Sequence, residues 1–289
     1  NMFTVVIFHK EIPEIEFYCH VNPKELLENN TLSYYGTENL KIADLYERER
    51  KRYETRQKVK ADFINEIPEI NFENDRFEIF IPGPAGRLEA KYYKSKKNTS
   101  PIALVLHPHP QYGGTMNNKV VVDTFHSFMN NDFSVCRVNF RGVGKSDGEF
   151  DNGQGELADA AAALDWLERE NFDNSQCWIA GFSFGSLIAM QLLMRRPEIN
   201  RFVAISPQPN VYDFSFLSPC PTSGIVIYGK KDELVPVEHL NELNRRLSSQ
   251  KGIKVEFETI PDANHFFSKA DEGIEKSLNK YIKKESALY

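Results

Sequence analysis

From about residue 73 onward the sequence repeats one pattern, in which a short apolar run is followed by a turn and then by an amphipathic segment. Apolar runs of this length predict strands, and apolar residues that recur every three or four positions predict helices. Strands that alternate with helices build right-handed crossovers and a mostly parallel sheet covered on both faces. We therefore predict an α/β domain over residues 73–289 with an eight-stranded sheet.

The same patterns place the individual elements. Strands are expected at residues 76–81, 88–93, 102–106, 134–139, 177–180, 202–205, 225–228 and 253–258. Helices are expected at residues 119–129, 157–169, 186–195, 238–247 and 273–283. Because the Pro- and Gly-rich residues 82–86 join the first two strands, we expect these to form an antiparallel hairpin at one edge of the sheet.

The first part of the chain, residues 1–72, has a different composition. Its predicted elements are strands at 4–8 and 15–21, a short helix at 23–30 and a long polar helix at 40–67. Within that helix, residues 47–60 carry seven Lys or Arg against three Glu. Such charge runs usually face solvent, and the alternative is an arm that docks on a partner subunit or an acidic surface. We expect an N-terminal extension that acts as a lid or as the arm of a homodimer.

Composition and charge exclude several classes of protein. The chain has 41% hydrophobic and 26% charged residues, which is typical of compact globular proteins. Its net charge of −6 provides no chain-wide positive field, which argues against a dedicated nucleic-acid-binding protein. The apolar run at residues 3–8 is too short for a signal core or a membrane span, and the four cysteines lack metal-type spacing. We expect a cytoplasmic protein with reduced, mostly buried cysteines and no nucleic-acid or membrane partner.

The segment Gly181-Phe182-Ser183-Phe184-Gly185 follows a predicted buried strand and opens a predicted helix. A sharp strand-to-helix turn of this kind needs small residues two positions before and two positions after the serine, and it lifts the hydroxyl to the edge of the sheet. A helix N-terminus also favours a developing oxyanion, because backbone N–H groups there are unpaired. Ser183 is therefore the candidate nucleophile.

A serine nucleophile needs a base, and in this type of fold the order along the chain is serine, acid, histidine. Two histidines follow Ser183: His239 lies within a predicted helix, whereas His265 lies in the loop after the last strand. We favour His265 as the base. Asp232, in the loop after the preceding strand, is our choice for the acid that orients the imidazole. The alternatives for the acid are Glu233 and Asp262.

Two backbone amides are expected to bind the oxyanion. One is the amide of Phe184, directly after the nucleophile, and the other comes from the loop after the strand at 102–106. Since proline has no N–H to donate, His109 is the first choice within this loop. The second choices are the amides of Gln111 and Tyr112. A competing interpretation makes His107 and His109 metal ligands, but no acidic or thiol cluster accompanies them, and we predict no metal.

Further motifs point to a known family. They are Gly83-Pro84-Ala85-Gly86-Arg87-Leu88-Glu89, His107-Pro108-His109-Pro110 with Gly113-Gly114-Thr115-Met116, Asn139-Phe140-Arg141-Gly142, the segment 181–185, and Ala263-Asn264-His265-Phe266-Phe267. From about Phe77 to its C-terminus the chain resembles the small dienelactone-hydrolase-like esterases of the α/β-hydrolase superfamily. The resemblance implies a triad of Ser183, Asp232 and His265, hydrolysis through an acyl-enzyme, and no cofactor. Residues 1–72 fall outside it.

About twenty residues separate the strands predicted at 202–205 and 225–228, which is too few for a lid domain. We therefore expect an open, shallow site suited to small or flexible acyl groups. Its expected lining is aromatic, with core packing as the alternative for each residue: Tyr112, Phe182, Phe184, Phe214, Phe216 and Phe266. The sequence predicts a serine hydrolase acting on carboxylic esters or thioesters. A non-catalytic binding or scaffold protein of the same fold is the alternative. Peptidase action is a third possibility, and no residue of the sequence excludes it.

Overall fold

The computed structural model describes residues 76–268 and 273–286, together with four strands within the first 41 residues. The chain divides into two compact units, Asn1–Ile70 and Asn71–Tyr289. No helix in the described part of the chain is both long and apolar enough to cross a membrane. The predicted roles of residues 1–72 stay predictions.

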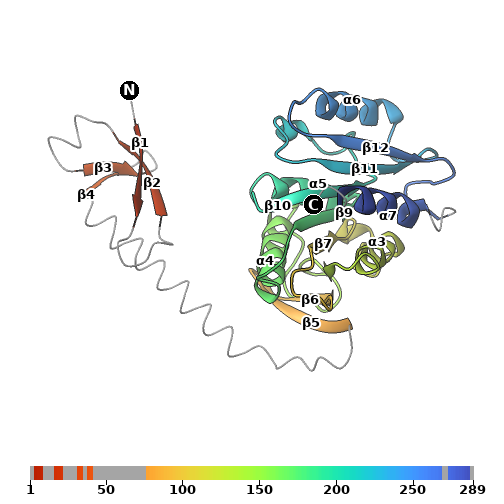
Figure 1. Ribbon diagram of the computed structural model, residues 1–289, viewed down its shortest axis with the longest axis horizontal. Helices are drawn as coiled ribbons and strands as arrows, with labels where there is room; N and C mark the ends of the chain where they lie inside the picture. The colour runs from red at the N-terminus through yellow and green to blue at the C-terminus, as the bar shows by residue number, and fades with distance from the viewer. Residues whose placement is uncertain are drawn as a thin grey trace. The chain divides into compact units, whose positions relative to one another are not determined.

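The first unit contains a four-stranded antiparallel sheet in the order β1-β2-β3-β4 (Figure 1). Its strands are β1 Phe3–Phe8, β2 Glu16–Val21, β3 Thr31–Tyr34 and β4 Glu38–Lys41. β1 and β2 correspond to the two predicted strands. The prediction that a helix begins at residue 40 is wrong, because Leu40 pairs with Leu32 of β3, and cross-strand pairing outweighs a weak helical pattern. The remainder of that predicted helix, and the helix predicted at 23–30, lie outside the described residues.

The second unit is built on an eight-stranded sheet in the order β12-β11-β10-β9-β7-β8-β6-β5, which confirms the predicted α/β architecture (Figure 1). β5 and β6 form the expected antiparallel hairpin at one edge, β6 pairs antiparallel with β8, and the other neighbours are parallel. The strands are β5 Arg76–Gly83, β6 Gly86–Tyr93, β7 Ile102–Leu106, β8 Ser134–Val138, β9 Cys177–Phe182, β10 Ile199–Ile205, β11 Gly224–Gly229 and β12 Val255–Ile260.

Helices cover both faces of this sheet (Figure 1). They are α3 Lys119–Met129, α4 Gln154–Glu170, α5 Phe184–Leu193, α6 Val237–Ser248 and α7 Gly273–Ser286. Successive side chains of a strand point to opposite faces. Accordingly, Leu104 of β7 packs in the core cluster with residues of α4, α5 and α6, whereas Ala103 and Val105 pack in the cluster with α3 and α7. Three cysteines are buried and form no disulfide: Cys136, Cys177 and Cys220.

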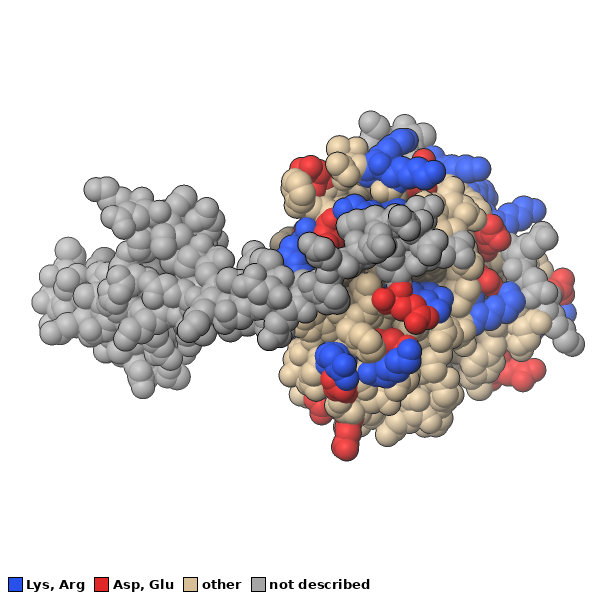
Figure 2. All heavy atoms as spheres, turned by 90° about the horizontal axis from the view of Figure 1, so that it is seen from below, with Lys and Arg blue, Asp and Glu red and all other residues tan. Residues whose placement is uncertain are grey.

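Charged side chains of both signs occur across the face drawn in Figure 2. Ion pairs on the surface of the second unit include Lys91 with Glu78 (3.1 Å) and Lys231 with Asp262 (2.8 Å). Among the side chains drawn in colour, the view therefore shows a mixed surface and no single-sign field of the kind that attracts polyanions.

The topology brings several loops to one edge of the sheet. Because parallel strands end at the same edge, the loops after β7, β9, β10, β11 and β12 meet there, which is where open α/β sheets place their ligand sites. The connection between β10 and β11 contains one short 3-10 helix, Ser215–Leu217, and no separate domain. This edge is therefore the place to look for a site.

Candidate active site

Ser183 occupies a strained turn between β9 and α5. Its φ of 53° lies in the left-handed region that non-glycine residues seldom adopt. Two glycines make room for the turn: a Cβ on Gly181 would lie 2.1 Å from the carbonyl oxygen of Gly185, and a Cβ on Gly185 would lie 2.5 Å from that of Leu106. The Ser183 N–H donates to the carbonyl of Ile205 in β10 (2.8 Å). The serine is thereby fixed at the carboxyl edge of the sheet.

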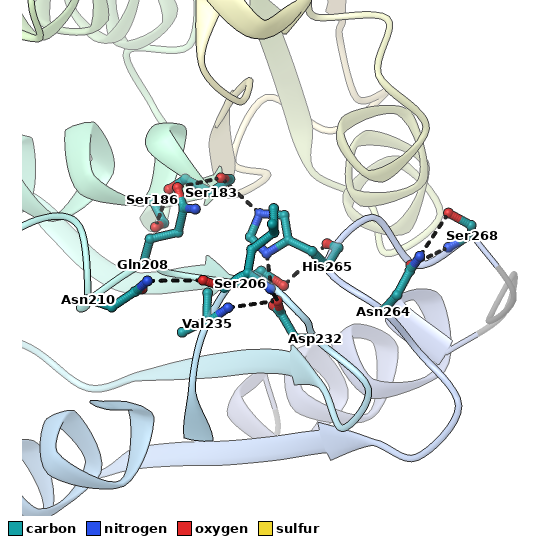
Figure 3. A network of polar contacts seen from close by, with 11 residues as sticks. Ser183, Ser186, Ser206, Gln208, Asn210, Asp232, Val235, Asn264, His265 and Ser268 are labelled. Atoms are coloured by element: carbon teal, nitrogen blue, oxygen red, sulfur yellow. Dashed lines mark hydrogen bonds and ion pairs between the residues drawn. The ribbon is translucent and has the colours of Figure 1, made fainter. Parts of the chain in front are cut away.

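The imidazole of His265 lies between Ser183 and Asp232 (Figure 3). His265 Nε2 is 3.0 Å from Ser183 Oγ, and His265 Nδ1 is 2.8 Å from Asp232 Oδ2. The backbone N–H groups of Leu234 and Val235 donate to the other oxygen of this carboxylate, which holds it in place. Since an ionised carboxylate only accepts hydrogen bonds, Nδ1 carries a proton and Nε2 is left as the acceptor that faces the hydroxyl. The side chains of His265 and Asp232 are 3% and 2% exposed.

The alternative acids and base lie elsewhere. Glu233 is exposed, and Asp262 is exposed and paired with Lys231 at 2.8 Å. The Lys231 ammonium holds the pKa of the Asp262 carboxyl below its usual range. His239 is exposed on α6. Of the candidates, the structure therefore brings Asp232 and His265 to Ser183.

The predicted oxyanion donors are two backbone amides, that of Phe184 and one from the loop after β7. The Phe184 amide is the first N–H of α5, where no intrahelical acceptor exists. In the loop after β7, the Gln111 amide already donates to His109 Nδ1 (3.2 Å), and the Tyr112 amide donates to the His109 carbonyl (3.1 Å). This favours the His109 amide over both alternatives as the second donor.

His107 fixes the peptide that carries the His109 N–H. Its Nδ1 lies 2.6 Å from the carbonyl oxygen of Pro108, and its Nε2 accepts from the N–H of Phe140 (3.0 Å). Because a carbonyl accepts, Nδ1 is the protonated nitrogen, and burial lowers the pKa of His107 to about 4. In a trans peptide the C=O and N–H point in opposite directions, so this bond orients the N–H of His109.

The geometry of the two histidines does not suit a metal. Both ring nitrogens of His107 are engaged with backbone groups, and His109 Nδ1 accepts from Gln111. In the described ranges, no group of three or more His, Cys, Asp or Glu side chains is placed to hold a metal ion. His107 therefore has a structural role in the loop.

Aromatic rings surround the His109 side chain. Its ring lies 4.7 Å from that of Tyr112, 4.9 Å from Phe150 and 4.8 Å from Phe184, measured between centroids, and Tyr212 follows at 6.1 Å from Phe184. Tyr112 is 87% exposed, so the cluster reaches from the core to the surface. Sequence reasoning missed Phe150 and Tyr212, because both belong to irregular loops with no pattern that indicates where they point.

Other predicted aromatics lie on the far side of the imidazole or in the core. Phe182 and Phe266 pack against the His265 ring at 5.6 and 5.1 Å, and Phe266 is half-exposed. Phe214 is buried in the core cluster and stacks on Phe216, with 6.0 Å between ring centroids. Substrate contact by any of these rings stays a prediction.

One polar neighbour of the nucleophile was not anticipated. The side-chain oxygen of Gln208, in the loop after β10, lies 3.0 Å from Ser183 Oγ (Figure 3). A glutamine in a loop rich in proline and polar residues gives no signal in a single sequence. Only the convergence of the β9 and β10 ends reveals it.

The fold and the arrangement of Ser183, His265 and Asp232 define the class of α/β hydrolases. The family model for the alpha/beta hydrolase fold matches residues 109–221. An uncharacterized protein of Rickettsia prowazekii is 50% identical over 209 residues, which cover 71% of this chain and 88% of that protein. The chain belongs to the α/β-hydrolase family.

Two solved structures are similar. A protein of unknown function from Agrobacterium tumefaciens, described as a putative alpha/beta hydrolase, is 50% identical with a TM-score of 0.71, and the match covers 73% of this chain and 97% of that one. A Xanthomonas campestris protein, described as an α/β serine hydrolase without a lid, is 27% identical with a TM-score of 0.66 over 75% of this chain and 98% of that one.

Proposed function

We propose that the protein is a serine hydrolase that cleaves carboxylic esters or thioesters, with Ser183 as nucleophile, His265 as base and Asp232 as the acid that orients it. The observation that carries the proposal is the unbroken chain of contacts from Ser183 Oγ through the imidazole to Asp232, at 3.0 and 2.8 Å. These distances lie within the reach that proton transfer to and from a catalytic histidine requires.

In the acylation step, Ser183 Oγ attacks the carbonyl carbon and gives its proton to His265 Nε2. The carbonyl π electrons move onto the oxygen, which the Phe184 and His109 amides stabilise. Asp232 stabilises the imidazolium that forms. The tetrahedral intermediate then expels the alcohol or thiol, which takes the proton from Nε2 and leaves the acyl group on Oγ.

In the deacylation step, a water molecule takes the place of the alcohol or thiol. His265 Nε2 removes one proton from this water, and the resulting hydroxide attacks the acyl carbon. The C–Oγ bond breaks as the imidazolium returns the proton to Oγ, which releases the carboxylic acid and restores the free serine.

The surroundings of the site support small or flexible acyl groups. The connection between β10 and β11 holds only the 3-10 helix Ser215–Leu217, and the similar Xanthomonas protein is described as lacking a lid. Exposed Tyr112, which packs on His109, and half-exposed Phe266, which packs on His265, supply apolar surface for such groups. A panel of short- and long-chain esters, coenzyme A thioesters and lactones would identify the preferred group.

The test is the Ser183→Ala variant. We expect turnover of p-nitrophenyl acetate to fall by about four orders of magnitude or more, because the nucleophile is lost. A fluorophosphonate probe should modify the wild-type protein at Ser183 and leave the variant unlabelled. Ser215→Ala is the matched control, since its hydroxyl bonds only Asp213 in an exposed loop. Equal turnover by wild type and Ser183→Ala would instead favour a non-catalytic scaffold.

A further inference from the structure

The nucleophilic oxygen has two close neighbours, and only one of them is the base. Ser183 Oγ lies 3.0 Å from His265 Nε2 and also 3.0 Å from Gln208 Oε1, and the two side chains reach it from different loops (Figure 3). A hydroxyl has a single proton to donate. The imidazole and the amide oxygen therefore compete for the proton that catalysis must pass to the imidazole.

The backbone holds Gln208 in this position. Its carbonyl accepts hydrogen bonds from the N–H groups of Val211 (3.0 Å) and Tyr212 (2.9 Å), which closes a turn behind the side chain. In the same loop, the Asn210 side chain donates to the carbonyl of Leu234 (3.0 Å), next to the loop that carries the acid. The backbone of Gln208 is thus held by contacts that do not involve the nucleophile, while the side-chain amide contacts Ser183 Oγ.

The direction of the amide decides what Gln208 does to the reaction. With its oxygen toward Oγ, the amide accepts the hydrogen bond of the hydroxyl, so the hydroxyl proton is not directed at His265 Nε2. A half-turn about the last side-chain bond exchanges the oxygen and the NH₂ group, which have nearly the same size. The amide then donates an N–H to Oγ, and the hydroxyl proton is free to go to His265 Nε2.

We propose that Gln208 is a further catalytic residue, whose amide turns to donate an N–H to Ser183 Oγ when negative charge develops there. The proposal rests on the proposed function, since negative charge develops on Oγ only as it gives its proton to His265 during attack and as it leaves the acyl carbon. Gln208 donates a hydrogen bond and transfers no proton. It acts in both half-reactions, because Oγ is the attacking atom in acylation and the leaving atom in deacylation.

The test uses two substitutions in the full chain, with p-nitrophenyl acetate as the probe. Gln208→Leu keeps the size of the side chain and removes the donor, and we expect kcat to fall roughly 10- to 100-fold while KM stays within about twofold. Gln208→Glu places an obligate acceptor against Oγ at neutral pH, so its kcat should fall further, by about 100-fold or more.

The pH dependence separates this role from a structural one. Below about pH 5 the introduced carboxyl binds a proton and regains a donor, so the ratio of wild-type to Gln208→Glu activity should shrink as the pH falls. Wild type and variant share His265 and Asp232, and their activities are compared as a ratio at each pH. Asn210→Ala is the control: it disturbs the same loop without touching Oγ, and its activity ratio to wild type should not vary with pH.

Thermal unfolding of each variant confirms that it is folded. Two results would overturn the role of Gln208: a Gln208→Leu variant with the kcat of the wild type, or a ratio of wild-type to Gln208→Glu activity that stays constant across pH. In either case the proposed function still stands if the wild type is active and is labelled at Ser183. If the fluorophosphonate probe fails to label Ser183 in the wild type, both proposals fall together.

Discussion

At the scale of a single residue, the neutral His107 side chain connects the loop after β7 with the loop after β8. Its protonated Nδ1 holds the Pro108 carbonyl, and its bare Nε2 accepts from the Phe140 N–H, so a second proton would break the bond to Phe140. Full burial lowers the pKa of His107 to about 4, whereas an unfolded histidine has a pKa of about 6.5. Between these two pKa values, His107 is therefore protonated in the unfolded chain and neutral in the folded protein.

This difference predicts a pH-dependent stability. Between about pH 6.5 and pH 4 the unfolded chain gains a proton at His107 and the folded chain does not, so the free energy of unfolding falls as the pH falls. From pH 7 to pH 5 the loss is about 2 kcal/mol. In His107→Gln, whose amide oxygen can still accept from Phe140, this contribution should be missing. Urea unfolding of both proteins at the two pH values measures it, and equal pH dependence would contradict the prediction.

The sequence predicts individual residues only where the topology dictates their place. Ser183 directly follows β9, and His265 lies in the loop between β12 and α7, so strand order alone places both at the carboxyl edge of the sheet. Gln208 follows β10 by three residues, yet nothing in its neighbourhood distinguishes a side chain aimed at the nucleophile from one in solvent. Such contacts depend on how a loop turns, which single-sequence patterns do not specify.

At the scale of elements, the start of α5 lies directly against the end of β7, which bears on the distance between the two amides proposed to bind the oxyanion. A Cβ at Gly185 would lie 2.5 Å from the carbonyl oxygen of Leu106 and 2.6 Å from that of His107. Both neighbours are backbone atoms, so they cannot swing aside. The helix approaches the loop this closely only because position 185 has no side chain.

Gly185→Ala should therefore damage activity more than stability. We expect α5 to shift away from the loop, with a stability loss of about 1–3 kcal/mol and a fall in kcat of about 100-fold or more as the Phe184 and His109 amides separate. Gly252→Ala is the control, because it imposes strain at a φ of +86° in a turn remote from the site. The expectation would be refuted if Gly185→Ala and Gly252→Ala lowered the melting temperature by similar amounts and also had equal kcat values.

The elements themselves are well predicted, with differences at their ends. Helix α5 begins at Phe184 and not at residue 186, because packing against the β7 loop outweighs the poor helix propensity of Gly185. Strand β12 runs from Val255 to Ile260, two residues later than expected, since pairing of Val255 with Gly224 sets its register. Periodicity indicates which elements exist, while tertiary contacts decide where they end.

At the scale of the whole molecule, the described residues of the second unit form two core clusters of their own. Both core clusters consist of residues from Ile79 onward, and the Agrobacterium protein matches 73% of this chain over 97% of its own length. The Agrobacterium protein thus has the same fold, although it has no counterpart to the part of this chain that lies outside the match.

Deletion of residues 1–72 should give a protein that folds cooperatively and keeps the p-nitrophenyl acetate activity of the full chain within about twofold. The physical reason is that the site and both core clusters lie within the retained residues. Solution mass before and after the deletion tests the dimer-arm prediction, and a changed KM for larger esters tests the lid prediction. An insoluble or inactive product would show that the second unit depends on the first.

The nucleophile and its base are 82 residues apart along the chain, on the central β9 and beyond the outermost β12. Long-range strand pairing is slow to form during folding, because loop closure must precede the contacts that reward it. The proposed activity should therefore arise late in folding, after the sheet is complete. A folding species in which β9 has formed but β12 has not docked has a serine with no proton acceptor. After dilution from urea, the return of activity should therefore follow the completion of the sheet and not its nucleation.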